Sequence, residues 1–231
     1  MIPLAGLTRA KRSPWQYPPD MNPESEPVRS PPTGWTFFRQ WLKNPMRVAA
    51  ISPSSKQLAR QMMSQLPPSC LRVIELGGGT GVFTQALLGH GIAPADLLVL
   101  ELNEELHQHL VRLFPSIAVV CGDASDLRQI AARHGFADDA RADAVISGLG
   151  LLSMARPMQQ SILSAAFDSM PPDGRFVQFT YGPANPVTRE VIDTLGLVAR
   201  RASFTWWNVP PATVYVYQRR TSRAIEAHSM R

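Results

Sequence analysis

The sequence predicts an α/β protein whose core is a doubly wound, mostly parallel sheet of seven strands, with amphipathic helices near the N-terminus. Short apolar runs alternate with stretches of helical periodicity from about Leu71 onward, which is the pattern of repeated strand–helix–strand units. The first apolar run leads into a glycine-rich turn at residues 77–81, and open parallel sheets bind ligands at such strand ends. The chain has 231 residues, 45% of them hydrophobic, which is enough for one core of ordinary size.

The expected elements follow this alternation in order. A short run of β-branched and other apolar residues between turn residues predicts a strand, and apolar residues three and four apart predict a helix. The expected strands are residues 72–76, 96–101, 117–121, 142–148, 174–181, one within 197–206, and 213–218. The expected helices of this region are residues 82–90, 103–113, 125–134, 156–170 and a last one near 186–195. Two further helices are expected between about Gly34 and Leu66.

The glycine-rich turn favours a nucleotide-like cofactor. Glycine at positions 77, 79 and 81 removes the Cβ atoms that would keep a ligand away from the backbone, and it permits the positive φ values of a tight turn. A dinucleotide fingerprint would need a third glycine where this chain has Val82, so a pyrophosphate site is disfavoured. The alternation of Gly77, Gly79 and Gly81 behind Glu75 is instead typical of class I methyltransferases, Rossmann-like enzymes that hold S-adenosylmethionine.

Two more acids stand at the ends of the next two expected strands. Glu101 ends the second strand, where a carboxylate can accept hydrogen bonds from both ribose hydroxyls. Asp123 follows the third strand, where it can reach the amino group of adenine. A single strand-end Asp is about as often a helix cap, but three acids at three successive strand ends favour a cofactor site. We therefore expect Glu101 with its neighbour Leu102, and Asp123 with its neighbour Ala124, to contact S-adenosylmethionine.

Composition disfavours a metal site, a secreted protein and a membrane-spanning one. The two cysteines, Cys70 and Cys121, stand beside expected strands without metal-ligand spacing, so we expect reduced packing residues. Residues 1–10 lack the long apolar core of a secretory signal, and no run approaches the roughly 20 apolar residues that span a bilayer. We expect a soluble or peripheral protein in a reducing cytoplasm, without a metal ion.

Four regions are expected along the chain. Residues 1–32 contain eight prolines and little periodicity, which predicts a disordered tail. Residues 33–68 are expected to form the N-terminal amphipathic, membrane-binding helices. Residues 69–218 are expected to form the methyltransferase domain, and residues 219–231 a basic C-terminal tail.

Positive charge gathers in the N-terminal region. No Asp or Glu occurs between Glu26 and Glu75, whereas seven Lys or Arg do. At about 100° per residue, a helix from residue 35 would carry aromatic side chains on one side and basic ones on the other, until Pro45 ends or kinks it. The residues expected at a membrane surface are Trp35, Phe37, Phe38, Arg39, Trp41, Leu42, Lys43 and Arg47. Such a helix suits anionic headgroups, but packing on the sheet and contact with RNA phosphates stay open as alternatives.

Several segments are similar to one known family. They are residues 41–45, 50–55, 58–60, 75–84, 114–124, 147–149, 151–153, 178–183 and 208–215. Over about residues 35–218 the chain resembles bacterial phospholipid N-methyltransferases of the soluble Rhodobacter type. It departs from that family at two positions, with Gly78 and Gly150 where proline is common. Glycine loosens the backbone at both places, which predicts altered cofactor affinity or turnover.

The resemblance implies an activity and a place in the cell. It implies stepwise transfer of methyl groups from S-adenosylmethionine to the amine of phosphatidylethanolamine, towards phosphatidylcholine, at the inner face of the cytoplasmic membrane. It implies an anionic phospholipid surface as partner and a helix at 35–47 that acts as a membrane-binding lid. Neither a nucleic acid nor an obligate protein partner is expected. Ser54 and Ser55 are implied to close over the methionine end of the cofactor, although N-capping of the next helix also explains them.

Residues after the fourth and fifth expected strands are candidates for holding the amine. In amine-methylating relatives of this fold, the loop that here reads Ser147, Gly148 and Leu149 holds the attacking nitrogen through backbone carbonyls and short side chains. Tyr181 ends the fifth strand and could face the same nitrogen with its hydroxyl or its ring, which also tolerates a methylammonium charge. A core tyrosine with a satisfied hydroxyl is the alternative.

Two other functions stay open. An rRNA adenine N6-dimethyltransferase would share the cofactor turn and a basic surface, but that family normally shows an Asn-Leu-Pro-Tyr-like loop after strand four and a helical C-terminal domain. A non-catalytic lipid-surface binding module would keep the fold without turnover. The three acids at positions 75, 101 and 123 disfavour that second alternative.

Overall fold

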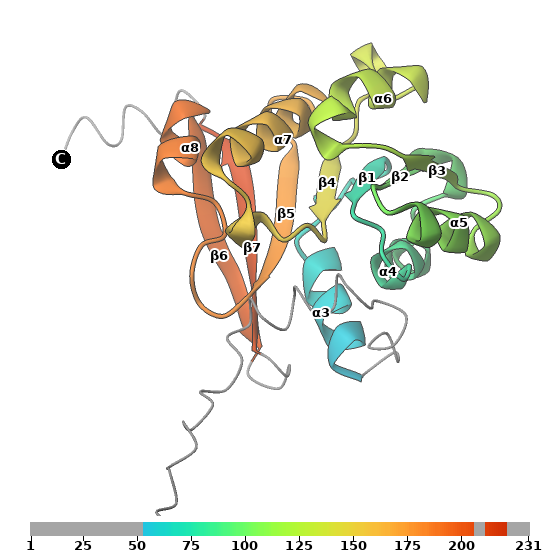
Figure 1. Ribbon diagram of the computed structural model, residues 1–231, viewed down its shortest axis with the longest axis horizontal. Coiled ribbons are helices and arrows are strands. Elements are labelled where there is room, and N and C mark those ends of the chain that lie inside the picture. The colour runs from blue at the N-terminus through green and yellow to red at the C-terminus, as the bar shows by residue number, and fades with distance from the viewer. Residues whose placement is uncertain (1–52, 206–210, 221–231) are drawn as a thin grey trace, which may run out of the picture. The chain divides into compact units, whose positions relative to one another are not determined.

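The computed structural model describes residues 53–205 and 211–220. They form a seven-stranded sheet with helices on both faces (Figure 1). The strands are β1 (Val73–Leu76), β2 (Leu97–Glu101), β3 (Ala118–Cys121), β4 (Ala144–Ser147), β5 (Arg175–Tyr181), β6 (Leu197–Thr205) and β7 (Ala212–Arg219). The α-helices are α3 (Pro53–Met63), α4 (Val82–His90), α5 (Glu104–Leu113), α6 (Leu127–Arg133), α7 (Arg156–Asp168) and α8 (Arg189–Thr194). The short 3-10 turns are η1 (Pro94–Asp96), η2 (Ala124–Asp126), η3 (Asp138–Ala140) and η4 (Leu151–Ser153).

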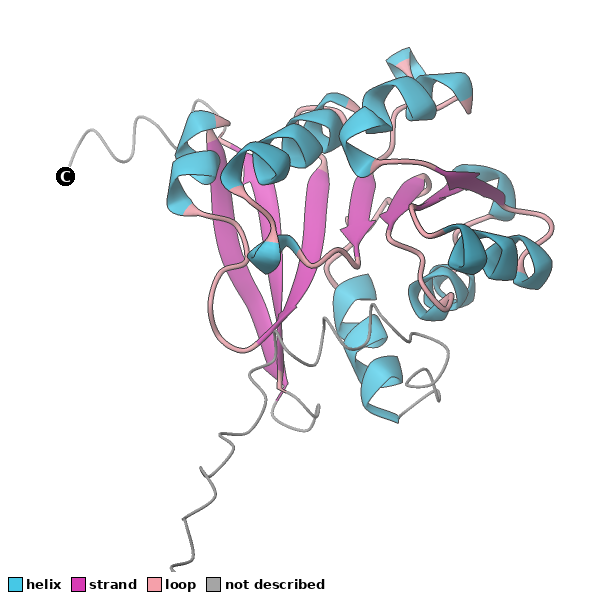
Figure 2. Cartoon of the chain, viewed as in Figure 1, coloured by secondary structure: helices cyan, strands magenta, loops and turns pink. Residues whose placement is uncertain are grey.

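The strand order is that of a doubly wound sheet. Across the sheet it runs β3-β2-β1-β4-β5-β7-β6. Strands β1 to β5 pair in parallel, whereas β7 pairs antiparallel with both β5 and β6, as the magenta strands of Figure 2 show. The chain moves outward from β1 to β3 and then returns to β4, so the order reverses between β1 and β4. Sheets of this kind bind ligands at that reversal, outside the carboxyl ends of the strands. The predicted fold class is confirmed.

Two apolar layers hold the sheet between its helices. Helices α3, α4 and α5 cover one face and α6, α7 and α8 cover the other (Figure 1). Alternate residues of β1 serve the two layers: Ile74 packs with Leu127 and Ile162, whereas Val73 packs with Met62 and Leu87. Because both faces are covered, β1, β2 and β4 are buried along their whole length.

Glycine and asparagine residues determine where several of the helices begin and end. Helix α4 spans the predicted residues 82–90, because Gly81 and Gly91 adopt left-handed conformations at its two ends. The side chain of Asn103 accepts the N–H of Leu106 and starts α5. The last predicted helix begins at Arg189 rather than near 186, because the Asn185 side chain accepts the N–H of Val187 and holds a turn there. Among residues 53–205 and 211–220, no helix has both the length and the apolar character needed to cross a bilayer.

Candidate functional site

A sharp glycine bend joins β1 to α4 at the carboxyl edge of the sheet. Gly77, Gly79 and Gly81 have φ angles of 73°, 56° and 82°, in the left-handed region that favours glycine. The backbone N–H groups of Gly77 and Gly78 both donate to the carbonyl of Leu100, at 2.8 and 3.2 Å. These two hydrogen bonds tie the bend to β2, so the three predicted glycines lie together at the strand edge.

Gly78 has no room for a side chain. A Cβ at this position would lie 2.6 Å from Cγ1 of Val99 and 2.8 Å from Cδ1 of Leu110. The side chains of β2 and α5 therefore pack directly on the bare backbone of the bend. Proline, which is common here in the family that the sequence resembles, would require both neighbours to shift.

Glu101 joins the glycine bend to the end of β2. Its side chain is buried, and its two oxygens accept the N–H groups of Gly79 and Asn103, at 2.8 and 2.9 Å. A carboxylate oxygen can accept more than one hydrogen bond, so acceptor capacity is left for ribose hydroxyls. The structure thus gives Glu101 a second role, because the same carboxylate holds the bend in place.

Glu75 is a fully buried acid beside the bend. Its Oε2 accepts a hydrogen bond of 2.6 Å from the hydroxyl of Thr84, while its Oε1 has no partner among the described residues. Burial raises the pKa of the Glu75 carboxyl to about 8, the Thr84 hydrogen bond opposes the rise, and the charge of Glu101 adds to it. An open, buried carboxyl oxygen near a second acid fits a cationic ligand, and S-adenosylmethionine carries a sulfonium and an ammonium group.

We expect the stability of the ligand-free protein to fall as pH rises, and Glu75→Gln to remove much of that fall. The folded-state pKa, about 8, lies above the ordinary value of 4.5, so between these values the native state holds a proton that the unfolded state has lost. Stability therefore falls through this window by roughly 4 kcal/mol, since one pKa unit corresponds to about 1.4 kcal/mol. Thermal unfolding of both proteins from about pH 5 to about pH 9 measures the difference. If the unfolding temperatures of the two proteins changed with pH in parallel, the Glu75 carboxyl would not be protonated in the native state.

Asp123 caps a turn, which is the simpler of the two explanations for an Asp at the end of a strand. Its Oδ1 accepts both the backbone N–H and the hydroxyl of Ser125, each at 2.8 Å, at the start of η2. Ala124 packs against the apolar layer between the sheet and helices α6, α7 and α8. Leu102, which follows Glu101, is 67% exposed and leaves an apolar side chain at the same edge of the sheet. Contact of these three residues with S-adenosylmethionine, and of Asp123 with its adenine, stays a prediction.

The loop after β4 touches the glycine bend. The N–H of Gly148 donates to the carbonyl of Leu76 at 2.8 Å, and a Cβ at Gly148 would lie 2.8 Å from the carbonyl oxygen of Gly77. Ser147 is buried, and its hydroxyl accepts the N–H of Leu149 at 3.3 Å. The predicted acceptor loop and the predicted cofactor bend are therefore in direct backbone contact.

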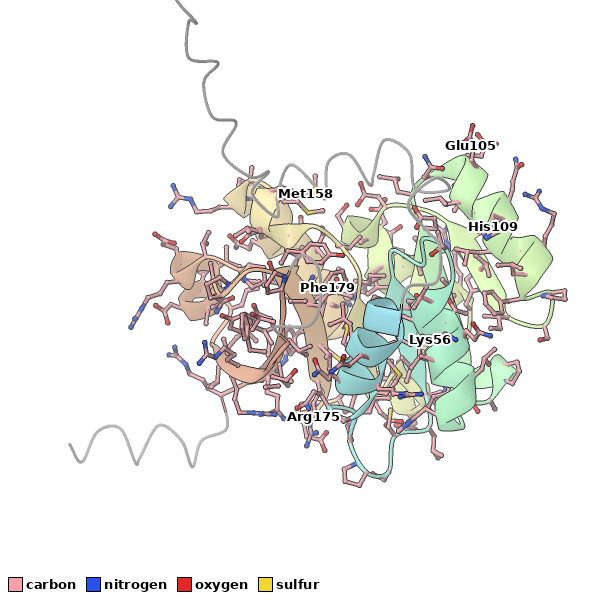
Figure 3. All side chains as sticks on the ribbon, turned by 90° about the horizontal axis from the view of Figure 1, so that it is seen from below. Lys56, Glu105, His109, Met158, Arg175 and Phe179 are labelled. Carbon is pink, nitrogen blue, oxygen red and sulfur yellow. The ribbon has the colours of Figure 1, made fainter. Side chains whose placement is uncertain are left out.

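An aromatic row lies beside this contact, and only one of its members is evident from the sequence. The ring centroids of Phe83 and Phe179 are 5.5 Å apart, as are those of Phe179 and Tyr181. Phe179 lies on the side of the sheet that α3 covers (Figure 3). A Cβ at Gly148 would lie 3.7 Å from the Phe83 ring, which places the row next to the acceptor loop. Burial raises the pKa of the Tyr181 hydroxyl, so that hydroxyl is neutral at neutral pH.

Comparison with known proteins places the chain in a family. An ornithine lipid N-methyltransferase of Singulisphaera acidiphila is 30% identical over 185 residues, which cover 78% of this chain and 92% of that protein. The chain belongs to the lipid N-methyltransferases. No protein-family model matches this lipid N-methyltransferase. The resemblance drawn from the sequence is thus confirmed at the level of lipid N-methylation, while its phosphatidylethanolamine-specific part stays a prediction.

Solved structures with the same fold are S-adenosylmethionine-dependent enzymes. One from Archaeoglobus fulgidus is 14% identical with a TM-score of 0.56, and covers 79% of this lipid N-methyltransferase and 100% of its own chain. A TehB-like enzyme from Corynebacterium glutamicum is 18% identical with a TM-score of 0.53, covering 81% and 98%. The glycopeptide N-methyltransferase MtfA in complex with S-adenosylmethionine is 15% identical with a TM-score of 0.53, covering 74% and 96%. At the level of this shared fold the cofactor prediction is confirmed.

Some expectations are corrected and others lie beyond the described residues. The lipid N-methyltransferase keeps Cys70 half-buried, where burial raises the pKa of its thiol to about 12, but Cys121 is exposed because β3 is an edge strand. The expectation of a packing residue is therefore wrong for Cys121. No cluster of metal-ligating side chains occurs in residues 53–205 and 211–220. Ser54 and Ser55 lie in the first turn of α3, and their predicted contact with the cofactor stays a prediction. The helix predicted at 35–47 lies outside the described residues.

Proposed function

We propose that this enzyme transfers methyl groups from S-adenosylmethionine to the amine of phosphatidylethanolamine, and to its mono- and dimethylated forms, at a membrane surface. The observation that carries the proposal is the contact between the two loops. A glycine bend pinned by Glu101 meets the loop around Gly148, so a methyl donor on one loop and an amine on the other would be neighbours. The 30% identical lipid N-methyltransferase supports a lipid as the carrier of that amine.

The residues of the acceptor loop would orient the amine. When bound, S-adenosylmethionine supplies an electrophilic methyl group and its own leaving group, so the protein needs chiefly to position and desolvate the amine. A backbone carbonyl of the acceptor loop would accept an N–H of the amine and turn the nitrogen lone pair toward the bend. The neutral hydroxyl of Tyr181 is not a base at neutral pH, so the amine has to arrive deprotonated or lose its proton to water.

The aromatic row would hold the nitrogen as methylation proceeds. Each added methyl group removes an N–H donor, which weakens hydrogen bonding to the carbonyls of the acceptor loop. Aromatic faces attract a methylammonium cation without needing N–H groups. The rings of Phe83, Phe179 and Tyr181 supply such faces next to Gly148, which supports more than one round of methylation.

A basic cleft supports a phosphate-bearing lipid. Between α3 and α4 lies a cleft of about 430 Å³. Exposed Lys56, Arg60 and His90 line it together with the apolar residues Ala59, Met63, Val82 and Ala86, and Figure 3 shows Lys56 on α3. A cationic rim over an apolar floor matches a phosphodiester joined to acyl chains. An ornithine lipid, the substrate class named for the relative, carries no phosphate diester and is the second candidate.

The helix at 35–47 is proposed to bring the enzyme to the inner face of the cytoplasmic membrane. Its sequence places Trp35 and Phe38 on an apolar side and Arg39 and Lys43 on a basic side. Helices of this kind lie in the headgroup region, and attraction to anionic lipids strengthens their binding. The proposal includes an anionic phospholipid surface as partner and no nucleic acid.

Labelled methyl transfer tests the substrate. The purified protein is incubated with labelled S-adenosylmethionine and, in separate arms, vesicles containing phosphatidylethanolamine, vesicles containing an ornithine lipid, and undermethylated rRNA. We expect label in phosphatidylethanolamine, followed by its dimethyl and trimethyl forms. Label only in the ornithine lipid would overturn the phosphate-bearing substrate but keep lipid amine methylation. Label only in RNA would overturn the proposal.

The same assay tests the membrane helix. Trp35→Glu with Phe38→Glu is expected to lower transfer to anionic vesicles at least about tenfold, because two charges replace the apolar side. Transfer to a short-chain, water-soluble phosphatidylethanolamine should change little, and salt should weaken vesicle binding of the unchanged protein. Equal transfer to vesicles by both proteins would remove the helix from the proposal.

A further inference from the structure

Gln178 is a buried amide whose hydrogen bonds go to the acceptor loop and to its own strand. It lies on β5 beside Ser147 of β4 and is fully buried. Its Nε2 donates to the carbonyl of Leu149 at 2.8 Å and to the carbonyl of Phe179 at 2.6 Å. Its Oε1 has no partner among the described residues. Such a group is costly inside a core, since an unpaired buried polar atom loses its hydrogen bonds to water.

A leucine or methionine would suit this place in β5 better if packing were the only requirement. The neighbours of Gln178 across the sheet are Ser147 on one side and Tyr215 on the other, and Phe176 two residues earlier points into the apolar layer. What the amide adds is the pair of N–H groups, and one of them is aimed at the loop that would hold the amine.

The carbonyl of Leu149 is the point at which Gln178 holds the acceptor loop. A carbonyl oxygen has two lone pairs, and here one accepts from Gln178 at 2.8 Å and the other from the N–H of Leu151 at 2.9 Å. The Leu149 side chain meanwhile contacts the bend, with Cδ2 3.0 Å from the place where a Gly77 Cβ would stand. Leu149 thus connects the cofactor bend with Gln178, and the amide of Gln178 and the N–H of Leu151 together set the direction of its carbonyl.

A second buried glutamine, Gln159, holds the far end of the same loop, and its hydrogen bonds differ from those of Gln178. Nε2 of Gln159, on α7, donates to the carbonyls of Leu151 and Pro186 at 2.8 and 3.1 Å, and Oε1 accepts the N–H of Thr188 at 3.0 Å. Both the nitrogen and the oxygen of the Gln159 amide are hydrogen-bonded, and they join two loops, as expected of a residue with a structural role. Of these two amides, that of Gln178 alone leaves its oxygen without a partner among the described residues, and it alone bonds the Leu149 carbonyl, next to Gly148.

We propose that Gln178 is a positioning residue for methyl transfer: by holding the Leu149 carbonyl, its amide fixes the acceptor loop against the glycine bend and so orients the amine of the lipid. The inference rests on the proposed function. It predicts a specific failure, in which the cofactor still binds and the protein still folds but the amine is misoriented. Misplacement of a reacting group by about an ångström can lower a rate by about 100-fold.

The test compares Gln178→Met and Gln178→Leu, which keep volume but lack the donor, with Ser169→Ala. Ser169 is also buried and donates to the carbonyl of Ala165, at the far end of α7. We expect kcat on the lipid amine to fall about 10- to 100-fold in both Gln178 variants, with the Kd for S-adenosylmethionine changed less than about twofold. Ser169→Ala should lose thermal stability to a similar degree and keep its kcat.

Three outcomes would overturn the inference. One is unchanged kcat in a folded Gln178 variant. Another is a loss of cofactor affinity in proportion to kcat, which would make Gln178 a structural residue of the whole site. The third is an equal loss of kcat in Ser169→Ala. Methylation of no lipid amine by the unchanged protein would instead overturn the proposed function itself, so the two failures are distinguishable.

Discussion

Glu101→Ala is expected to weaken S-adenosylmethionine binding by at least about 100-fold. The carboxylate accepts the N–H groups of Gly79 and Asn103, at 2.8 and 2.9 Å, and is buried with 7% exposure. Hydrogen bonds to a charged group contribute about 1.5–3 kcal/mol each, and about 1.4 kcal/mol corresponds to a factor of ten in Kd. Removing the acid frees the glycine bend and also removes the predicted acceptor for the ribose hydroxyls.

Calorimetric titration of S-adenosylmethionine into the two proteins measures the effect. Glu104→Ala is the matched control, because it removes an exposed acid three residues away, in the first turn of α5. It should bind the cofactor as the unchanged protein does. Glu101→Gln keeps one acceptor oxygen and should fall between the two. Unaltered affinity in Glu101→Ala would refute both the ribose role and the role in holding the bend.

The fold and the cofactor-binding edge of the sheet can be predicted from the sequence because the patterns that indicate them lie within short segments. The alternation of apolar runs places α4 at its observed bounds, and the acids at 75 and 101 appear at strand ends because parallel strands finish at one edge. Glycine at 77, 79 and 81 predicts left-handed φ angles, which the structure shows. These are properties of neighbouring residues, so no long-range information is needed to find them.

The acceptor side depends on contacts between distant segments, and there the sequence is less informative. Antiparallel pairing places β7 beside β5, so Thr213, Tyr215 and Tyr217 direct their hydroxyls to the loop that follows β5. These bonds hold residues 182–188 in an irregular path where helical periodicity predicts a helix from about 186. The role of Gln178 is equally hidden, since nothing near position 178 in the chain reveals the carbonyl that it bonds.

Gly148→Ala is expected to abolish most methyl transfer, by about 100-fold or more, because one methyl group would separate the two loops. A Cβ at this position would lie 2.8 Å from the carbonyl oxygen of Gly77, a backbone atom that cannot rotate away. The acceptor loop or the bend has to move, and either shift changes the distance between the methyl donor and the amine. Both the cofactor Kd and kcat should worsen, unlike the kcat-specific loss expected for Gln178.

Gly89→Ala is the control for this substitution. Gly89 lies in α4, the helix that follows the bend, and a Cβ there would meet nothing within 4 Å. Alanine favours a helix over glycine by up to about 1 kcal/mol, so Gly89→Ala, which adds one methyl group to the lining of the cleft between α3 and α4, should keep its cofactor Kd and unfold at a slightly higher temperature. If Gly148→Ala were fully active, the loops would tolerate a wider separation, and the contact that carries the proposed function would lose its importance for catalysis.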